Sequence, residues 1–268
     1  MQWWEAVLLG AIQGLTEFLP VSSSGHLLIF EYLFGLQQVP LTFDVLLHLG
    51  TLTAVVIFFR QQLLHLSRDM VLKIGLATVP IVIGGLFLKS VVEGMRGSLA
   101  PLIVTYAFTA GMLFIADQLM RSEKKGSWLN NMIEKVHQRV TGQEEPSWLQ
   151  ALIVGLFQVL AVLPGISRSG TTVSAGIFSG ISLEKAFSFA FIISIPAVLG
   201  AVVLDLGDAF LNTNILALPW GLYFLGVVVS GITGWLALYI LQWFITKRVL
   251  WPFALYAAAV SVLLVFFA

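Results

Sequence analysis

Cysteine is absent from the 268-residue chain, and charged residues are scarce. The absence of cysteine excludes disulfides, thiolate metal sites and a cysteine nucleophile. Lysine, arginine, aspartate and glutamate make up 10% of the residues, with 14 basic and 14 acidic side chains, whereas soluble domains carry about 25%. So few charges could not cover the surface of a soluble protein of this size. The composition therefore excludes a disordered chain, a basic nucleic-acid-binding protein and a soluble enzyme.

Apolar residues, in contrast, make up 58% of the chain and give it a mean hydropathy of +0.95. A transmembrane helix needs about 20 predominantly apolar residues. Six segments are long enough, so the sequence predicts an all-α polytopic membrane protein that forms a single membrane domain over residues 1–268. The predicted spans are Phe43–Phe59, Ile74–Val92, Leu102–Met120, Leu183–Leu204, Trp220–Ile245 and Leu250–Ala268.

Two further apolar segments, Trp3–Leu19 and Trp148–Leu163, are each followed by a loop rich in glycine, proline and serine. The loops span residues 20–26 and 164–172, and only a short apolar stretch follows each of them. Short apolar runs of this kind mark re-entrant pieces more often than full spans. We therefore expect two helix–loop–helix segments that enter the membrane and return to the same side.

Basic residues are concentrated on one side of the predicted spans. The charged loop 121–147 lies on that side, while the opposite side receives only Lys89 and Arg96. Cytoplasmic loops are enriched in lysine and arginine, so the first side is predicted to be cytoplasmic and both termini to lie outside. The other basic loop residues on the cytoplasmic side are Arg60, Arg68, Lys73, Lys247 and Arg248.

A shift of 145 positions aligns the two broken segments with each other. Three spans separate the copies, so the pattern predicts an inverted repeat of residues 1–120 and 148–268, joined by the loop 121–147. Inverted repeats with broken helices bring the breaks together near the midplane of the membrane, so the two loops are expected to form one site. The aligned residues include Trp3 with Trp148, Gly10 with Gly155, Gln13 with Gln158, Ser22 with Ser167 and Ser24 with Ser169.

The two broken segments carry the candidate site residues. Ionisable side chains inside a membrane are costly and are functional candidates by default, and here one carboxylate, one imidazole and one guanidinium lie in or beside two Gly/Ser loops. The first segment offers Gln13, Glu17, Ser22, Ser23, Ser24, Gly25 and His26. The second offers Ser167, Arg168, Ser169, Gly170, Thr171 and Thr172.

This set of residues suits the binding of phosphate. Helices are predicted to start again near Leu27 and Thr171, and backbone N–H groups at a helix N-terminus attract anions. The guanidinium of Arg168 offers a planar fork for phosphate oxygens. The serine hydroxyls can donate to the remaining oxygens, or one of them can attack phosphorus when a base accepts its proton.

Proton transfer and cation binding would fall to the remaining polar side chains. His26 can exchange a proton near neutral pH. Glu17 and Gln13 are four residues apart and share a helix face, so they offer hard oxygen ligands to Mg²⁺ or Ca²⁺. Asp44 and His48, four residues apart on the next span, could line the site, and a supporting role behind its direct ligands is expected for them. Asp117 is expected to lie at a span end, where charge is ordinary.

Structural interpretations of the same residues compete with these functional ones. Serine-rich loops with glycine and proline are usually turns, so for any single serine the two interpretations are balanced. Glu17 could serve only to pair with Arg168 and hold the two halves together. For Glu17, His26 and Arg168 taken jointly, the functional interpretation is favoured.

Two sequence stretches resemble the undecaprenyl-diphosphate phosphatase family, also called the bacitracin-resistance proteins. They are QGLTEFLPVSSSGH at 13–26 and PGISRSG at 164–170, and the resemblance extends over essentially the whole chain in length, span count and loop order. It implies hydrolysis of undecaprenyl diphosphate to undecaprenyl phosphate and inorganic phosphate. That reaction regenerates the lipid carrier for peptidoglycan synthesis and confers resistance to bacitracin, which competes for the same substrate.

The resemblance also carries over site residues. The acidic motif of the family, Glu or Gln followed four residues later by Glu, matches Gln13 and Glu17, and the second-motif arginine matches Arg168. The family histidine matches His26, and the serine-rich stretch matches residues 22–24. Membership would imply a divalent cation, a homodimer, the plasma membrane of a bacterium and a site open to the outer face. Nucleic acid is not an expected partner.

The expected mechanism assigns a role to each of the main candidates. Arg168, the helix N-termini and a cation held by Glu17 would bind the diphosphate, and His26 would move the proton. The nucleophile stays open among Ser23, His26 itself and water. A transporter or flippase of an anionic polyprenyl lipid is the alternative, since inverted repeats with broken helices are typical of transporters, and a non-catalytic lipid-binding protein is a third hypothesis.

Overall fold

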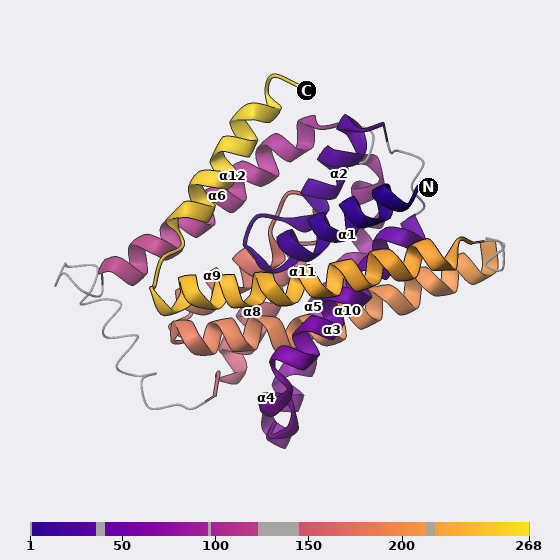
Figure 1. The fold of residues 1–268 in the computed structure, drawn as a ribbon. Helices are drawn as coiled ribbons and strands as arrows, with labels where there is room; N and C mark the ends of the chain where they lie inside the picture. The colour runs from indigo at the N-terminus through magenta and orange to yellow at the C-terminus, as the bar shows by residue number, and fades with distance from the viewer. Residues whose placement is uncertain (1, 36–40, 96–97, 123–144, 213–217, 268) are drawn as a thin grey trace.

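The computed structural model describes residues 2–35, 41–95, 98–122, 145–212 and 218–267, and its regular structure over these residues is helical (Figure 1). The first half of the chain forms α1 (Trp3–Phe18), α2 (Ser23–Leu33), α3 (Leu41–Phe58), α4 (Arg60–Leu64), α5 (Arg68–Met95) and α6 (Ala100–Ser122). The second half forms α8 (Trp148–Leu160), α9 (Arg168–Phe178), α10 (Leu183–Asn212), α11 (Trp220–Thr246) and α12 (Trp251–Leu264).

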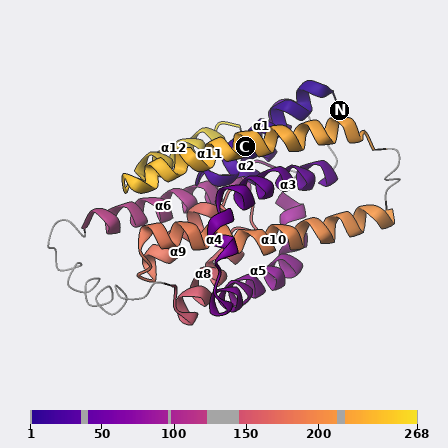
Figure 2. The same cartoon turned by 60° about the horizontal axis from the view of Figure 1, so that its bottom comes forward.

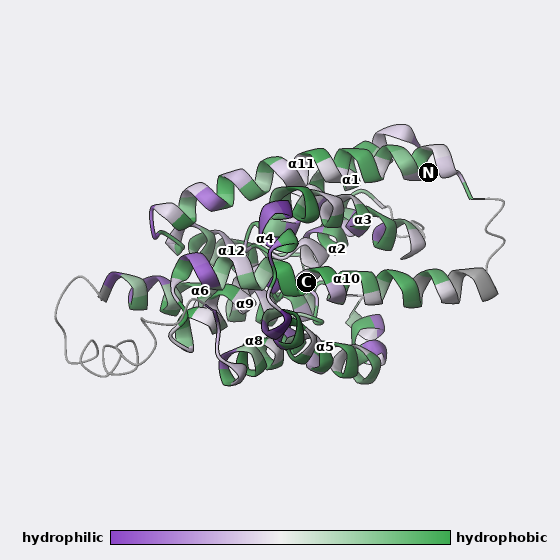
Figure 3. Cartoon of the chain, turned by 90° about the horizontal axis from the view of Figure 1, so that it is seen from below, coloured by the Kyte–Doolittle hydropathy of each residue, from purple (hydrophilic) through white to green (hydrophobic). Residues whose placement is uncertain are grey.

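Four helices within the described ranges, α5, α6, α10 and α11, are long and apolar enough to cross a membrane. Figure 3 shows apolar residues along much of their length, and large side chains such as Leu86 and Phe87 on α5 are exposed. Exposed apolar surface of this extent is expected to face lipid, so the chain is a multi-pass membrane protein. The predicted spans Phe43–Phe59 and Leu250–Ala268 form the shorter helices α3 and α12, and the total of six spans stays a prediction.

The two broken segments form pairs of short helices, α1 with α2 and α8 with α9. These helices have 11 to 16 residues, which corresponds to about 16–24 Å and is less than the thickness of the hydrocarbon core. α1 ends at Phe18 because Leu19 is extended and Pro20 follows it. The first segment therefore ends within one residue of the predicted position, whereas α8 ends at Leu160, three residues before the predicted end at Leu163.

The second helix of each pair starts earlier than the sequence predicts, and the predicted starts at Leu27 and Thr171 are wrong. α2 begins at Ser23 and α9 at Arg168. Ser22 caps α2 by accepting the N–H of Gly25, and Ser167 caps α9 by accepting that of Gly170. Because a serine cap satisfies an N–H group that has no helical partner, the helices extend back to the capping serines.

Glycines allow α1 to cross α11 at close range. A Cβ built on Gly14 would lie 2.0 Å from the hydroxyl oxygen of Thr233 and 2.4 Å from the carbonyl oxygen of Ser230. Rotation of a side chain cannot relieve contacts this short, because one of them is with a backbone atom. Gly14 is therefore required for the crossing that holds the end of α1.

Replacing Gly14 with alanine is expected to destabilise the protein by about 1–3 kcal/mol, because the added methyl group forces the two helices apart. Thermal unfolding of the purified protein in detergent measures the effect. Gly111→Ala is the matched control, since a Cβ at Gly111 meets nothing within 4 Å among the described residues. Equal melting temperatures for the two variants would contradict the close crossing.

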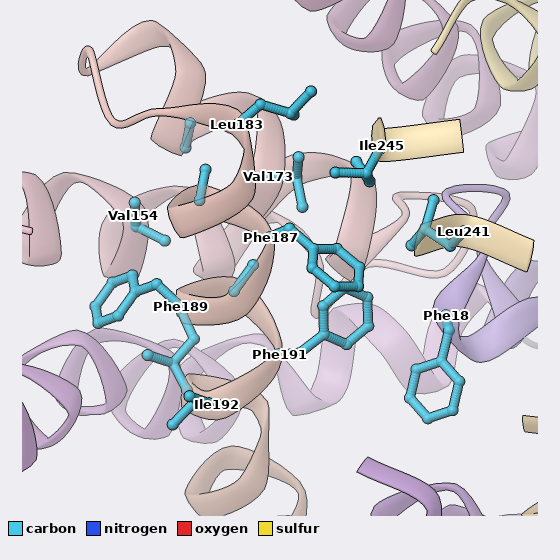
Figure 4. Packing of buried hydrophobic residues seen from close by; sticks show 14 of the residues in the cluster. Phe18, Val154, Val173, Leu183, Phe187, Phe189, Phe191, Ile192, Leu241 and Ile245 are labelled. Atoms are coloured by element: carbon cyan, nitrogen blue, oxygen red, sulfur yellow. The ribbon is translucent and has the colours of Figure 1, made fainter. Parts of the chain in front are cut away.

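An aromatic cluster packs the end of α1 against α10 (Figure 4) and against Phe59, which follows α3. The ring of Phe18 lies 5.6 Å from that of Phe191, and Phe59 contacts both Phe187 and Phe191 at 5.6 and 6.0 Å between ring centroids. Phe18 is 1% exposed and directly follows Glu17. The cluster therefore fixes the position of the last turn of α1.

Asp117 holds the start of α12 against α6, and these two helices lie side by side (Figure 1 and Figure 2). Its side chain is fully buried, and Oδ1 accepts the N–H groups of Leu250 at 2.8 Å and Trp251 at 2.9 Å. Arg121 donates to Oδ2. The sequence predicts an ordinary charge at a span end; the structure instead gives Asp117 a helix-capping contact 133 positions away.

Candidate functional site

The two broken-helix loops meet inside the protein, as the sequence predicts. The N–H of Gly165 donates to the hydroxyl oxygen of Ser22 at 3.1 Å, although 143 positions separate them. The hydroxyl of Ser169 donates to the carbonyl of Leu19 at 3.3 Å. Polar backbone at membrane depth is tolerated where it is buried in protein or lines a wet cavity, and these contacts bury both loops.

A cavity of about 240 Å³ lies where the loops meet. One part of its wall is polar and comes from α1, both loops and α3. The other part is apolar and comes mainly from α10 and from the segment between α8 and α9. The polar lining residues are Glu17, Ser22, Ser23, Ser24, His48, Ser167 and Arg168. The apolar ones are Val45, Ile81, Ala161, Val162, Ile166, Ala197, Val198, Ala201 and Val202.

Glu17 and Arg168 form an ion pair across the two halves of the chain. Nη2 of Arg168 contacts Oε1 of Glu17, and their side chains are 18% and 5% exposed. A charge this deeply buried needs a partner and hydrogen bonds to offset the loss of hydration. Glu17 receives both, since Oε2 also accepts the side-chain N–H of Gln13 at 2.9 Å.

Ser23 is the first residue of α2, and its hydroxyl donates to Oε2 of Glu17 at 2.6 Å. A short hydrogen bond from a hydroxyl to a carboxylate is the geometry in which a base can accept the proton of a nucleophile. Because Glu17 also pairs with Arg168, a hydroxyl, a carboxylate that can accept its proton and a guanidinium suited to phosphate share one cavity.

The N-termini of α2 and α9 both line this cavity. Ser23 and Ser24 form the first turn of α2, and Arg168 opens α9; all three residues line the cavity. The first N–H groups of a helix have no partner within it, and together with the helix dipole they favour an anion. The arrangement is that of an anion-binding site.

His48 on α3 also lines the cavity, although a supporting role behind the direct ligands is expected for it from the sequence. Its Nδ1 lies 2.8 Å from the carbonyl oxygen of Asp44, and its Nε2 lies 3.7 Å from Oε2 of Glu17. Asp44 is buried but is not one of the described lining residues. The side chain of His48 is 28% exposed and can reach a ligand in the cavity.

His26 does not line the cavity among the described residues. Its ring is 5% exposed and lies between two tyrosines. Nδ1 lies 2.7 Å from the carbonyl oxygen of Ser22 and 2.9 Å from the hydroxyl oxygen of Tyr106, and Nε2 lies 2.7 Å from that of Tyr256. Neither tyrosine could be predicted from the sequence, because no motif or spacing joins them to a histidine 80 and 230 positions away.

The remaining predicted substrate-binding residues pack the loops and are absent from the described cavity lining. The hydroxyl of Thr172 donates to the carbonyl of Arg168 within its own helix at 2.8 Å, and Thr171 is buried. A Cβ on Gly25 would lie 2.7 Å from the hydroxyl oxygen of Tyr106, and one on Gly170 would lie 3.2 Å from Pro20. Ser169 contacts Leu19, so these residues hold the loops at close range.

Hard oxygen ligands for a cation are present, although within the described residues no three histidine, aspartate or glutamate side chains form a cluster suited to a metal. Oε1 of Gln13 is fully buried and has no hydrogen-bond partner among the described groups. It belongs to the side chain whose amide nitrogen contacts Glu17. Because Mg²⁺ takes one or two protein oxygens when phosphates and water supply the rest, Gln13 and Glu17 fit such an ion.

Comparisons with known proteins agree on one family. The family model for the bacitracin resistance protein BacA matches residues 6–263. An undecaprenyl-diphosphatase of Desulfatibacillum aliphaticivorans is 36% identical, with 96% of this chain and 95% of that protein covered. The undecaprenyl-diphosphatase of Carboxydothermus hydrogenoformans is 37% identical over 88% and 86%. Undecaprenyl-diphosphatase 2 of Stutzerimonas stutzeri is 34% identical over 98% and 97%.

Proposed function

Because the chain belongs to the bacitracin resistance protein family and dephosphorylates undecaprenyl diphosphate, we propose that this reaction takes place in the cavity between the two loops. The observation that carries the proposal is the hydrogen-bonded group of Ser23, Glu17 and Arg168, which joins both broken segments. The alternative function as a flippase is not favoured, since the relatives named above are diphosphatases.

The two parts of the cavity wall fit the two parts of a lipid diphosphate. The polar part, with Arg168 and the N-termini of α2 and α9, suits the diphosphate. The apolar part, which includes Val198 and Val202 of α10, suits the first isoprene units, because apolar surface is stabilised when it leaves water. The charged end of the substrate then meets the polar part of the cavity wall, and its apolar end meets the apolar part.

In the first step, the hydroxyl oxygen of Ser23 attacks the terminal phosphorus, and its proton passes to Oε2 of Glu17. The bond from that phosphorus to the bridging oxygen breaks, and undecaprenyl phosphate leaves with the electron pair. Arg168 donates to the oxygens of the transferred phosphoryl group, where it stabilises charge in the transition state. The 2.6 Å contact between Ser23 and Glu17 supports this assignment.

In the second step, water attacks the phosphoserine. The bond between phosphorus and Ser23 Oγ breaks, Glu17 returns its proton to that oxygen, and dihydrogen phosphate leaves. His48 lines the cavity close to Glu17 and can orient this water. The expected role of His26 as the proton carrier is not supported, because both of its ring nitrogens lie against Ser22 and the tyrosines.

We also propose that Glu17 and Gln13 hold a divalent cation, Mg²⁺ or Ca²⁺, when substrate is bound. The ion pair with Arg168 leaves the charge of the two partners balanced, whereas the diphosphate brings at least two negative charges. The unpartnered Oε1 of Gln13, buried beside Glu17, supports the site. When bound, the ion would supply positive charge next to the diphosphate.

Rapid quench with substrate labelled in the terminal phosphate tests the nucleophile. We expect the label to appear on Ser23 within a single turnover and to disappear as phosphate is released. Ser23→Ala should give no labelled protein, whereas Ser24→Ala, which alters a neighbouring cavity hydroxyl, should still be labelled. Unlabelled wild-type protein throughout a productive turnover would remove Ser23 and favour direct attack by water.

We further propose that the two halves are inverted copies of one unit. The support comes from helix crossings that repeat between them. A Cβ on Gly10 of α1 would lie 2.6 Å from the carbonyl oxygen of Gly226 on α11, and one on Gly155 of α8 would lie 2.5 Å from that of Ala77 on α5. Gly10 and Gly155 are equivalent under the shift of 145 positions.

We propose that the protein lies in the plasma membrane of a bacterium, with both termini outside. The side of the protein that carries Lys73, Glu145, Glu184 and Arg248 then faces the cytoplasm. Lys73 pairs with Glu145 at 3.7 Å, and Arg248 pairs with Glu184 at 3.9 Å. Gln150 donates to the carbonyl of Ser179 at 3.0 Å, which joins the start of α8 to the end of α9. Opening of the site to the outer face, the homodimer and competition by bacitracin stay predictions of the resemblance.

A further inference from the structure

We propose that Tyr106 and Tyr256 are positioning residues for the phosphatase reaction, acting through His26 on the backbone of Ser22 and so on Ser23. The proposal rests on the proposed role of Ser23 in the cavity. The five residues come from α2, α6 and α12 and from the loop that precedes α2. We call Tyr106, His26 and Tyr256 the tyrosine clamp.

The clamp encloses the imidazole on two sides. The ring of Tyr256 stacks on that of His26 at 5.6 Å and an angle of 10°, and the ring of Tyr106 meets it edge-on at 5.8 Å and 76°. Tyr106 is fully buried, and Tyr256 is 44% exposed. Both hydroxyl oxygens lie within 2.9 Å of a ring nitrogen, so the imidazole can neither tilt nor move towards the cavity without losing hydrogen bonds.

These contacts also fix which nitrogen of the neutral ring carries the proton. The carbonyl oxygen of Ser22 can only accept, so Nδ1 at 2.7 Å carries the hydrogen and donates to it. Nε2 is then an acceptor, and the hydroxyl of Tyr256 donates to it at 2.7 Å. Tyr106 donates to the carbonyl of Ser22 at 3.4 Å. The Ser22 carbonyl therefore sets the tautomer, and the hydroxyl of Tyr256 stabilises it by donating to the free nitrogen.

Ser22 has a backbone conformation that needs such support. Its φ of 68° lies in the left-handed region, which a residue other than glycine adopts only when its surroundings enforce it. The carbonyl is held by His26, and the hydroxyl oxygen accepts the N–H groups of Gly165 at 3.1 Å and Gly25 at 3.4 Å. The carbonyl also accepts the backbone N–H of His26 at 3.2 Å, and the clamp adds the side-chain restraint on it.

The position of Ser23 depends on this strained residue, because Ser23 follows it directly as the first residue of α2. If the carbonyl of Ser22 were released, its backbone would relax and rotate the first turn of the helix. The hydroxyl of Ser23 would then leave its 2.6 Å contact with Glu17. Small displacements of a reacting group reduce the rate of the chemical step much more than the affinity for substrate.

Tyr256→Phe removes the hydroxyl and keeps the stacked ring. We expect kcat to fall about tenfold, the loss of one well-placed hydrogen bond, with KM unchanged within about twofold because the cavity lining is intact. Labelling of Ser23 in a rapid-quench experiment should slow by the same factor. Tyr106→Phe, which removes the second hydroxyl, should also lower kcat without raising KM.

A double-mutant cycle tests whether the tyrosine acts through His26. In a His26→Ala background, Tyr256→Phe should cause no further loss, because the group it positions is gone. Tyr239→Phe is the matched control: this tyrosine is half exposed and packs against Phe58 and Trp235, outside the clamp. Its kcat should match that of the wild type.

Three results would overturn the proposal. They are a wild-type kcat for Tyr256→Phe, an equal loss from Tyr256→Phe with and without His26, and a loss confined to KM. If Ser23 is still labelled in any of these cases, only the clamp is wrong. If wild-type protein is never labelled at Ser23, the proposed nucleophile itself fails. Melting temperatures measured alongside show whether a variant that is inactive has merely unfolded.

Discussion

Replacing Arg168 with alanine is expected to lower kcat/KM for phosphate release from undecaprenyl diphosphate by about a thousandfold, the loss seen when one preorganised donor to a transition-state oxygen is removed. Arg168 opens α9 and lines the cavity with its guanidinium against Glu17. It is the cationic side chain of the described lining, so no neighbour there can replace it on the phosphoryl oxygens. Phosphate release from substrate in detergent micelles measures the effect.

The same substitution is expected to lower stability, since it leaves Glu17 buried without its counter-charge. Removing one partner of a buried ion pair typically costs about 3–5 kcal/mol. Activity must therefore be expressed per folded protein, from unfolding curves recorded on the same preparation. Arg168→Lys keeps the charge but loses the planar fork, and we expect it to recover stability more than activity.

Arg121→Ala is the matched control for Arg168→Ala. Arg121 also pairs with a buried carboxylate, that of Asp117 on α6. This side chain is fully buried against the start of α12 and lies outside the described cavity lining. Its loss should reduce stability and leave kcat/KM per folded molecule unchanged. If both variants lost activity in the same proportion, the effect of Arg168 would be one of folding, and its assignment to phosphate binding would be wrong.

The class of protein and the place of the site could be predicted from the sequence because both follow from local composition. Apolar runs long enough to span a membrane are stable in its hydrocarbon core. Loops such as 20–26 can lie at that depth only when protein covers them. The shared residues at a shift of 145 positions also paired the two loops correctly, as the contact between Ser22 and Gly165 confirms.

The detailed roles within the site could not be predicted, because they depend on how each helix is rotated about its axis. His26 is adjacent to the serines in the sequence, yet the first turn of α2 directs its ring between Tyr106 and Tyr256. His48 is 31 positions from Glu17 and still reaches the cavity. Sequence proximity favours His26, whereas the cavity lining includes His48, and the difference follows from the contacts that Tyr106 on α6 and Tyr256 on α12 make with His26.

Glu17→Gln is expected to lower kcat by about three orders of magnitude while KM stays constant or falls. The carboxylate accepts the proton of Ser23, and general base catalysis contributes about 10²–10⁴-fold. Glutamine keeps the shape and can still contact Gln13 and Arg168, but it cannot take the proton. Removing a negative charge beside the diphosphate reduces repulsion and offsets the weaker hold on the cation, so at saturating Mg²⁺ substrate binding should not weaken. A rise in KM with unchanged kcat would contradict the assignment of Glu17 as the base.

The dependence on divalent cation distinguishes the second role proposed for Glu17. After treatment with EDTA, activity should return with added Mg²⁺ or Ca²⁺, and Gln13→Glu should lower the half-maximal cation concentration by about tenfold, because an added carboxylate raises the affinity of an oxygen site. The cation should also raise the melting temperature of this variant more than that of the wild type. Gln61→Glu, on the exposed surface of α4, is the control. A half-maximal concentration unchanged by Gln13→Glu would mean that the buried oxygen at position 13 does not face the ion, and the proposed cation site would have to be abandoned even if Glu17 remained the base.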